Sequence, residues 1–226
     1  APDGRFDLEA LGADLAALPR ALGFARAALV GHDWGALAGY AACNLSPETF
    51  TKLAALAVPP IPAFLHNLPR DPAQLRRSWY IGLFQLPGLA GRRLAADDLA
   101  LLDRLWRAWS PGLDPAARDA AVAAVKDTFR RPGTQAAALA YYRALAPRRP
   151  AIFRRALALM RRPLRVPALV LAGADDGCIG PAMFDGAALA AQAPLELRVL
   201  PGLGHFMHLE APARVHRLLL DFLADA

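Results

Sequence analysis

The residues with the clearest potential for chemistry form a short Gly-His-Asp-Trp-Gly segment at positions 31–35. An apolar stretch, residues 27–30, precedes this segment, and an Ala-rich stretch of helical composition follows from Ala36. Small residues at both ends allow a sharp strand-to-helix turn, which presents the central side chain at the carboxyl end of a sheet. That side chain is the carboxylate of Asp33, which can attack an alkyl carbon and form an ester. The alternative interpretation is that Asp33 only caps the helix that follows.

Two later segments carry further titratable side chains to the same edge of the predicted sheet. Residues 168–173 form an apolar run typical of a fully buried parallel strand, and Asp175 and Asp176 follow it closely. A second apolar segment, residues 195–200, leads into a glycine-rich loop that contains His205. Because the carboxyl ends of parallel strands lie at one edge of a sheet, these groups are expected near the first turn. Their order along the chain is nucleophile, acid and histidine, as in α/β-hydrolases.

With this motif and this order, the sequence resembles the epoxide hydrolase branch of the α/β-hydrolases, which is close to the haloalkane dehalogenases and shares with them an Asp nucleophile followed by Trp. The resemblance covers nearly the whole chain. It implies that Asp33 is the nucleophile, that the backbone N–H of Trp34 is an oxyanion donor, and that His205 activates water. The loop at residues 174–183 is similar to an epoxide hydrolase segment in which an Asp lies five residues before a Pro. This register selects Asp176 as the acid of the triad.

Two tyrosines in the central part of the sequence favour an epoxide hydrolase over a haloalkane dehalogenase. Residues 78–88 and 138–143 resemble the epoxide hydrolase stretches that carry two ring-opening tyrosines, which match Tyr80 and Tyr142. An epoxide oxygen leaves as a strongly basic alkoxide and needs hydrogen-bond donors, which two protonated phenols can supply. The resemblance therefore implies a hydrolase that opens an apolar epoxide to a vicinal diol through an ester on Asp33. Both tyrosines could instead simply pack inside a helical region.

Two other functions stay open from the sequence. A haloalkane dehalogenase would use the same nucleophile, acid and histidine, because a halide leaves as a stable anion and needs only weak donors. Those donors would be tryptophans such as Trp79, Trp106 or Trp109. A truncated, inactive α/β-hydrolase remnant would serve as a folding or binding partner.

The beginning of the sequence departs from the family pattern. A complete member has several strands and a His-Gly-x-Pro loop before the nucleophile, and this loop supplies a second oxyanion donor; the sequence contains no such motif. We therefore expect an amino-terminally truncated α/β-hydrolase fold with a mostly parallel sheet flanked by helices. Its four core strands are predicted near residues 27–31, 53–58, 168–172 and 195–200. The strand before Asp33 would then have an exposed apolar edge.

The proline pattern predicts a single α/β-hydrolase domain over residues 1–226 with an inserted helical lid. Pro59 and Pro60 mark the departure from the core, and Pro163 marks the return. The core then comprises residues 1–59 and 163–226, and the lid comprises residues 60–162.

Composition excludes several classes of function. The net charge of +6 comes almost entirely from arginines that are dispersed over the lid, as expected of solvated helix faces rather than of a nucleic-acid patch. We expect neither secretion nor membrane spanning, because the given residues contain no basic start followed by an apolar core and a cleavage site, and no apolar run of about 18 residues. The two cysteines, Cys43 and Cys178, are too few for a disulfide framework. We therefore predict a soluble, cytoplasmic enzyme of bacterial type with a small-molecule substrate and no membrane partner. We predict no cofactor and no metal site, expect Cys178 to serve in packing, and assign no oligomeric state.

Overall fold

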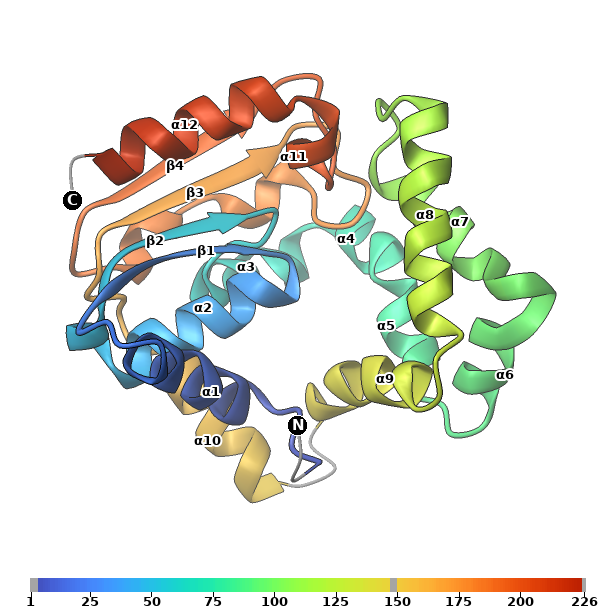
Figure 1. The fold of residues 1–226 in the computed structure, drawn as a ribbon, viewed down its shortest axis with the longest axis horizontal. Coiled ribbons are helices and arrows are strands. Elements are labelled where there is room, and N and C mark those ends of the chain that lie inside the picture. The colour runs from blue at the N-terminus through green and yellow to red at the C-terminus, as the bar shows by residue number, and fades with distance from the viewer. Residues whose placement is uncertain (1–3, 147–149, 225–226) are drawn as a thin grey trace.

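The computed structural model describes residues 4–146 and 150–224, and its centre is a four-stranded sheet with helices on both faces (Figure 1). The strands are β1 (Ala27–His32), β2 (Phe50–Leu56), β3 (Ala168–Gly173) and β4 (Leu195–Leu200). They lie in the order β1-β2-β3-β4, and every neighbouring pair is parallel. The predicted parallel sheet is therefore confirmed, and the loops that follow all four strands leave from one edge.

The burial of each strand follows from its place in the sheet. The central strands β2 and β3 are buried almost throughout, which explains the continuous apolar sequence of β3 and of residues 53–56 in β2. Strand β1 pairs only with β2 among the described residues, and its residues alternate in exposure. Leu29 faces Gly39 of the following helix, whereas Val30 faces away and is 48% exposed. Strand β1 is thus an edge strand of the described sheet, and it carries one exposed apolar side chain, Val30.

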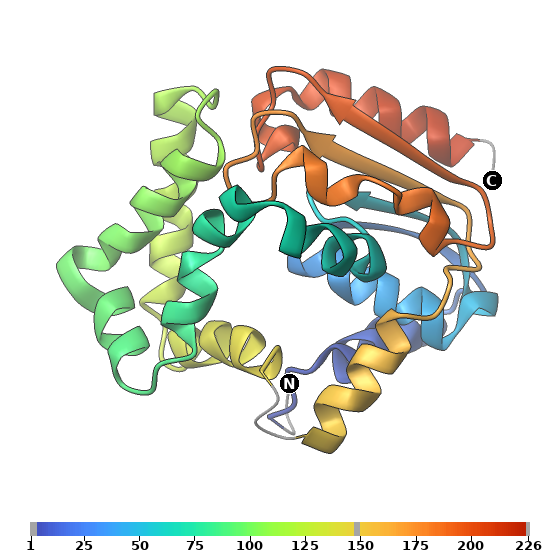
Figure 2. The same cartoon turned by 180° about the vertical axis from the view of Figure 1, so that it is seen from behind.

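Two hydrophobic clusters hold helices against the two faces of the sheet. On one face pack α1 (Leu8–Ala21), α2 (Trp34–Leu45) and α10 (Pro150–Met160), with Leu53 and Ala55 of β2 in the same cluster. On the other face pack α11 (Met207–Glu210) and α12 (Pro212–Ala224), as the opposite views in Figures 1 and 2 also show. The sheet is thus the middle of three layers.

The segment between β2 and β3 is mostly helical where the structure describes it, with short loops between the helices. It contains α3 (Ile61–Asn67), α4 (Pro72–Arg77), α5 (Trp79–Phe84), α6 (Leu89–Ala95), α7 (Ala100–Trp109), α8 (Pro115–Phe129), α9 (Thr134–Ala144) and α10. Helices α5 to α9 lie to one side of the sheet and share a small core of their own around Tyr80, Phe84, Leu94 and Leu139 (Figure 1). None of the described helices has an apolar stretch long enough to cross a membrane.

The helices of the predicted lid differ in what they contact. Helix α10 packs against α1 and α2, and α3 packs against the short 3-10 turns at Pro181–Phe184 and Ala187–Ala190. Both therefore contact core elements, whereas α5 to α9 mainly contact one another. Residues 147–149, inside the predicted lid, and residues 1–3 and 225–226 of the predicted domain lie outside the described part of the chain. The domain boundaries stay a prediction.

Candidate active site

The turn between β1 and α2 places the side chain of Asp33 above the edge of the sheet. Asp33 has φ 52° and ψ −119°, a conformation that costs energy for any residue with a Cβ. A Cβ atom on Gly31 would overlap the backbone carbonyl of Gly35, whereas a Cβ on Gly35 would meet open space. From the sequence we predicted that Gly31 and Gly35 both allow the sharp turn. In the structure the strain lies in Asp33 itself, and only Gly31 is required, for close approach of strand and helix.

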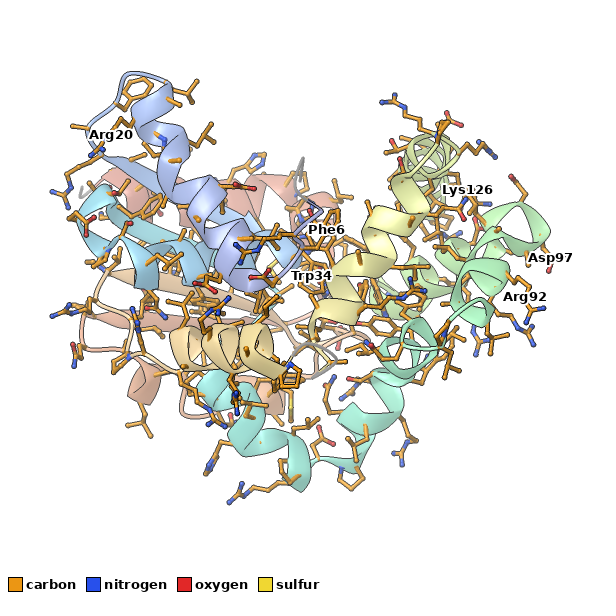
Figure 3. All side chains as sticks on the ribbon, turned by 90° about the horizontal axis from the view of Figure 1, so that it is seen from below. Phe6, Arg20, Trp34, Arg92, Asp97 and Lys126 are labelled. Atoms are coloured by element: carbon orange, nitrogen blue, oxygen red, sulfur yellow. The ribbon has the colours of Figure 1, made fainter. Side chains whose placement is uncertain are left out.

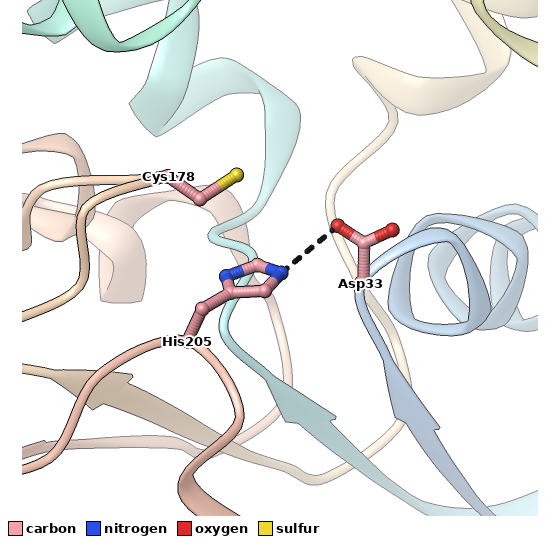
Figure 4. Close-up of side chains that lie close together, drawn as sticks. All are labelled: Asp33, Cys178 and His205. Atoms are coloured by element: carbon pink, nitrogen blue, oxygen red, sulfur yellow. Dashed lines mark hydrogen bonds and ion pairs between the residues drawn. The ribbon is translucent and has the colours of Figure 1, made fainter. Parts of the chain in front are cut away.

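The Asp33 carboxylate does not cap helix α2, because it makes no capping hydrogen bond to the first turn. Its Oδ1 atom lies 3.2 Å from the Nε2 atom of His205, as Figure 4 shows. Burial raises the pKa of Asp33, but the hydrogen bond from His205 and the charge of that ring outweigh burial and hold the pKa below its usual value. Its place at a helix N-terminus also favours the negative charge. Asp33 is therefore an ionised carboxylate that faces a histidine.

Asp176 lies in the loop after β3 and binds the ring nitrogen of His205 that does not face Asp33. Its Oδ2 atom lies 2.9 Å from Nδ1 of His205, and its Oδ1 atom accepts hydrogen bonds from the backbone N–H groups of Cys178 and Ile179. Asp176 is buried, whereas its neighbour Asp175 is exposed. The structure thus brings Asp176, rather than Asp175, to His205.

His205 lies fully buried in the loop after β4, between the carboxylates of Asp33 and Asp176. Burial lowers the pKa of His205, but the charges and hydrogen bonds of Asp176 and Asp33 outweigh burial and raise it to about 10. The ring is therefore an imidazolium at neutral pH while the Asp33 carboxylate is ionised. It donates Nδ1–H to Asp176 and Nε2–H to Asp33.

The carboxyl end of α7 braces two of these loops, a role that the sequence analysis missed. The carbonyl oxygen of Trp109 accepts hydrogen bonds from the backbone N–H of His205, at 2.9 Å, and of Gly177, at 3.2 Å. A Cβ on Gly177 would overlap the carbonyl of Ala108, so only glycine fits there. The glycines of these loops were the only signal in the sequence that another segment packs closely against them. The hydrogen-bond acceptor itself is the backbone carbonyl of Trp109, which the sequence does not reveal.

Gln74 is a second bracing residue that sequence reasoning did not find. It lies on α4, is 1% exposed, and donates from its amide nitrogen to the carbonyl oxygen of Cys178. Its amide oxygen accepts the N–H of Gly180. One helix of the predicted lid therefore holds the loop that carries Asp176.

The two predicted tyrosines come from different helices and meet near Asp33. Tyr80 of α5 and Tyr142 of α9 have ring centroids 5.7 Å apart, and the ring of Tyr142 meets that of Trp34 edge-on at 5.2 Å. Burial, together with the negative charge of Asp33, raises the pKa of both tyrosines above the usual value. Both phenols are therefore protonated at neutral pH and can donate hydrogen bonds. In this structure the Tyr80 hydroxyl lies 3.3 Å from the thiol sulfur of Cys178.

Two cavities meet at Asp33. The larger, of about 490 Å³, is shared by Asp33, Trp34, Tyr80 and Tyr142, and apolar side chains of the core and lid make up most of its wall. Figure 3 shows Phe6 and Trp34, two of its lining residues, between the core helices and α9. The other cavity, of about 310 Å³, is lined by Asp33, Tyr142 and His205 among mainly apolar and aromatic residues. Both cavities thus offer mainly apolar space next to Asp33.

The three tryptophans considered as halide donors occupy different places. Trp106 and Trp109 line the 310 Å³ cavity that Asp33 also lines. The Trp106 ring stacks on that of Phe206 with centroids 3.8 Å apart. Trp79 is 41% exposed, lies beneath the guanidinium of Arg104, and lines neither of the two cavities.

One group of potential metal ligands is present in the described part of the chain. Single donor atoms of Asp33, Cys178 and His205 lie within 4.8 Å of one another (Figure 4). From the sequence we predicted no metal site, because His32, His66, His208 and His216 lack metal-ligand spacing with cysteines or carboxylates. Cys178 was expected only to pack.

Comparisons with known proteins identify the family of the chain. The alpha/beta hydrolase family matches residues 1–218. Epoxide hydrolase 4 of Mus musculus is 25% identical over 97% of this chain, and the chain spans 60% of that relative's length. Epoxide hydrolase A of Mycobacterium tuberculosis is 29% identical, with 96% of this chain and 75% of that protein covered. The crystal structure of epoxide hydrolase A from Mycobacterium thermoresistibile superimposes with a TM-score of 0.73 at 28% identity, covering 97% of this chain and 76% of that one. The chain therefore belongs to the alpha/beta hydrolase family.

Proposed function

We propose that this chain carries the catalytic centre of an epoxide hydrolase, which opens an apolar epoxide to a vicinal diol through an ester on Asp33. The observation that carries this proposal is the pair of protonated phenols, Tyr80 and Tyr142, on the wall of the cavity that Asp33 also lines. The similarity to epoxide hydrolases supports it.

The first half-reaction forms a covalent ester. A carboxylate oxygen of Asp33 attacks one carbon of the epoxide, the bond from that carbon to the ring oxygen breaks, and the ring oxygen takes the proton of one of the two phenols, Tyr80 or Tyr142. The hydroxyl groups of Tyr80 and Tyr142 donate to that oxygen as its charge develops, in surroundings where the pocket excludes water. For Tyr80 this requires its hydroxyl to turn from the sulfur of Cys178 toward the substrate.

The second half-reaction hydrolyses the ester. Esterification removes the charge of Asp33, which is one of the two carboxylates that raise the pKa of His205. The ring then releases its proton more readily and, once neutral, can take a proton from water. The water oxygen attacks the ester carbonyl, and the backbone N–H of Trp34 donates to the resulting oxyanion. The diol oxygen then leaves with the proton that His205 took from water. The Asp33 carboxyl passes its proton to His205, which restores the carboxylate and the imidazolium, and the proton that His205 released earlier restores the phenol.

The shape of the site supports an apolar substrate. Both cavities have mainly apolar walls, and Asp33 lies where they meet. We propose that the substrate is a small apolar epoxide whose hydrocarbon group fills the larger cavity. Localisation and source stay predictions from the sequence.

A haloalkane dehalogenase is the second candidate. It is favoured by one observation, the two tryptophans at the smaller cavity, Trp106 and Trp109, whose indole N–H groups could bind a halide. The third candidate is an inactive remnant, for which we expect a folded chain that forms neither adduct nor product.

The deciding experiment measures intact protein mass and diol after incubation with styrene oxide, for the wild type and for Asp33→Asn. We expect diol, an adduct, or both from the wild type, and neither from the folded variant. Release of halide from a haloalkane, without reaction of the epoxide, would favour the dehalogenase. A chain that unfolds cooperatively on heating but forms no adduct and no product would favour the remnant.

A further inference from the structure

We propose that Asp33, Cys178 and His205 together form a binding site for a thiophilic divalent cation, with Zn²⁺ as the probe. The three donor atoms, one carboxylate oxygen, the Cys178 sulfur and an imidazole nitrogen, lie within 4.8 Å of one another. They come from three separate loops: the turn before α2, the loop after β3 and the loop after β4. This site goes beyond the epoxide chemistry, in which Cys178 has no role.

The geometry needs only a small adjustment to hold the ion. Zinc binds nitrogen and oxygen at about 2.0–2.2 Å and sulfur at about 2.3 Å, so neighbouring ligand atoms lie about 3.5 Å apart in a tetrahedral site. The Asp33 and His205 atoms are already 3.2 Å apart. Figure 4 shows that the Cys178 sulfur, the His205 ring and the Asp33 carboxylate border a common space. A side-chain movement of about 1 Å at Cys178 closes the remaining gap.

The donor types select the class of cation. A thiolate and an imidazole suit zinc and other borderline or soft ions, whereas Mg²⁺ and Ca²⁺ require several oxygen ligands. When the ion binds, the Cys178 thiol and the His205 Nε2 lose their protons to solvent as the metal–sulfur and metal–nitrogen bonds form. The thiolate and the Asp33 carboxylate then balance the two positive charges of the ion.

Neighbouring groups already orient two of the ligands. Asp176 accepts Nδ1–H of His205 at 2.9 Å, which directs the Nε2 lone pair toward the site, as carboxylate–histidine pairs do at zinc centres. The hydroxyl of Tyr80, 3.3 Å from the sulfur, can donate to the thiolate. Three protein ligands leave a fourth position for water, and the cavities that Asp33 lines provide the access route.

Occupation of this site would block the proposed reaction, because the ion would hold both the nucleophile and the base. Inhibition therefore rests on the proposed function, but binding does not. The two can be tested separately on the same protein.

The binding test uses the whole chain and the matched pair of cysteine variants that the sequence offers. Cys178→Ser removes the soft ligand, and Cys43→Ser changes the other buried cysteine, which lies in α2 outside this cluster. We expect one Zn²⁺ per chain by calorimetry for the wild type and for Cys43→Ser, and at least about 100-fold weaker binding for Cys178→Ser. Mg²⁺ at the same concentration should not bind.

Co²⁺ supplies a spectroscopic readout of the sulfur ligand. We expect a sulfur-to-cobalt charge-transfer band in the wild type and in Cys43→Ser. Equal Zn²⁺ affinity of the wild type and Cys178→Ser, or a Co²⁺ complex without that band, would overturn the site. If the chain shows no epoxide activity, these results still decide binding; if it is active, Zn²⁺ should inhibit wild type and Cys43→Ser at lower concentration than Cys178→Ser.

Discussion

The imidazole ring of His205 bridges two carboxylates, with its Nε2 atom 3.2 Å from Oδ1 of Asp33 and its Nδ1 atom 2.9 Å from Oδ2 of Asp176. The two acids come from different loops and differ in surroundings, because Asp176 is fully buried while the Asp33 side chain is 29% exposed toward the cavities. A change of charge on Asp33 therefore acts directly on the proton of His205.

Replacing His205 by Gln should allow the ester to form but prevent its hydrolysis. The glutamine cannot take a proton from water, so the adduct on Asp33 should accumulate to about one per chain while steady-state diol production falls by about 100-fold or more. Intact mass measured over time after mixing with styrene oxide checks this. His216→Gln, at an exposed histidine of α12, is the matched control and should leave both rates unchanged. Rapid turnover by His205→Gln would contradict the assignment.

Removing the hydroxyl of Tyr80 or of Tyr142 should slow formation of the ester. Each Tyr→Phe change deletes one donor to the leaving oxygen, which we expect to cost about 100- to 1,000-fold in the rate of adduct formation. Single-turnover kinetics with the epoxide measure that rate directly. Tyr40→Phe is the control, because its hydroxyl donates to the carbonyl of Val58 rather than facing Asp33. It should lower stability by about 1 kcal/mol and leave the rate unchanged.

Stability should fall as the pH rises above neutrality, because of His205. Its pKa in the folded chain is raised from 6.5 to about 10, so the folded state holds this proton more tightly than the unfolded state. The resulting stabilisation is complete below pH 6.5 and is lost as the pH rises toward about 10. Denaturant unfolding at several pH values should show a loss of a few kcal/mol across this window for the wild type. His205→Gln should have a flatter profile, and identical profiles would refute the coupling.

The two glycines of the turn should differ sharply in their tolerance of alanine. Gly31→Ala places a methyl group onto the backbone of Gly35, and we expect it to lower the free energy of unfolding by about 3 kcal/mol or more. Gly35→Ala meets open space within α2, so it should be neutral or stabilise by up to about 1 kcal/mol. Chemical denaturation of both variants at neutral pH measures the difference. If Gly35→Ala destabilised the chain as much as Gly31→Ala, the turn would need glycine at both positions.

The local pattern of the sequence determined the sheet and the chain order of the site. Continuous apolar runs mark β3 and residues 53–56 of β2, which are buried on both faces. A strand that ends in a glycine-flanked Asp predicts a turn at Asp33. Parallel strands then bring the segments that follow them to one edge, which is why Asp176 and His205 could be expected beside Asp33. These features depend on residue types at short range and on the geometry common to all parallel sheets.

Only the tertiary structure decided the contacts that depend on how distant helices pack. The carbonyl of Trp109 and the amide of Gln74 hold the loops of the site, and the loop residues that they bind lie far from them in the sequence. The approach of the Cys178 sulfur to Asp33 and His205 likewise follows from the meeting of three loops. The charge of His205 depends on two carboxylates placed by different strands. Packing and electrostatic coupling are set by distances in space, and those distances exist only once the chain has folded.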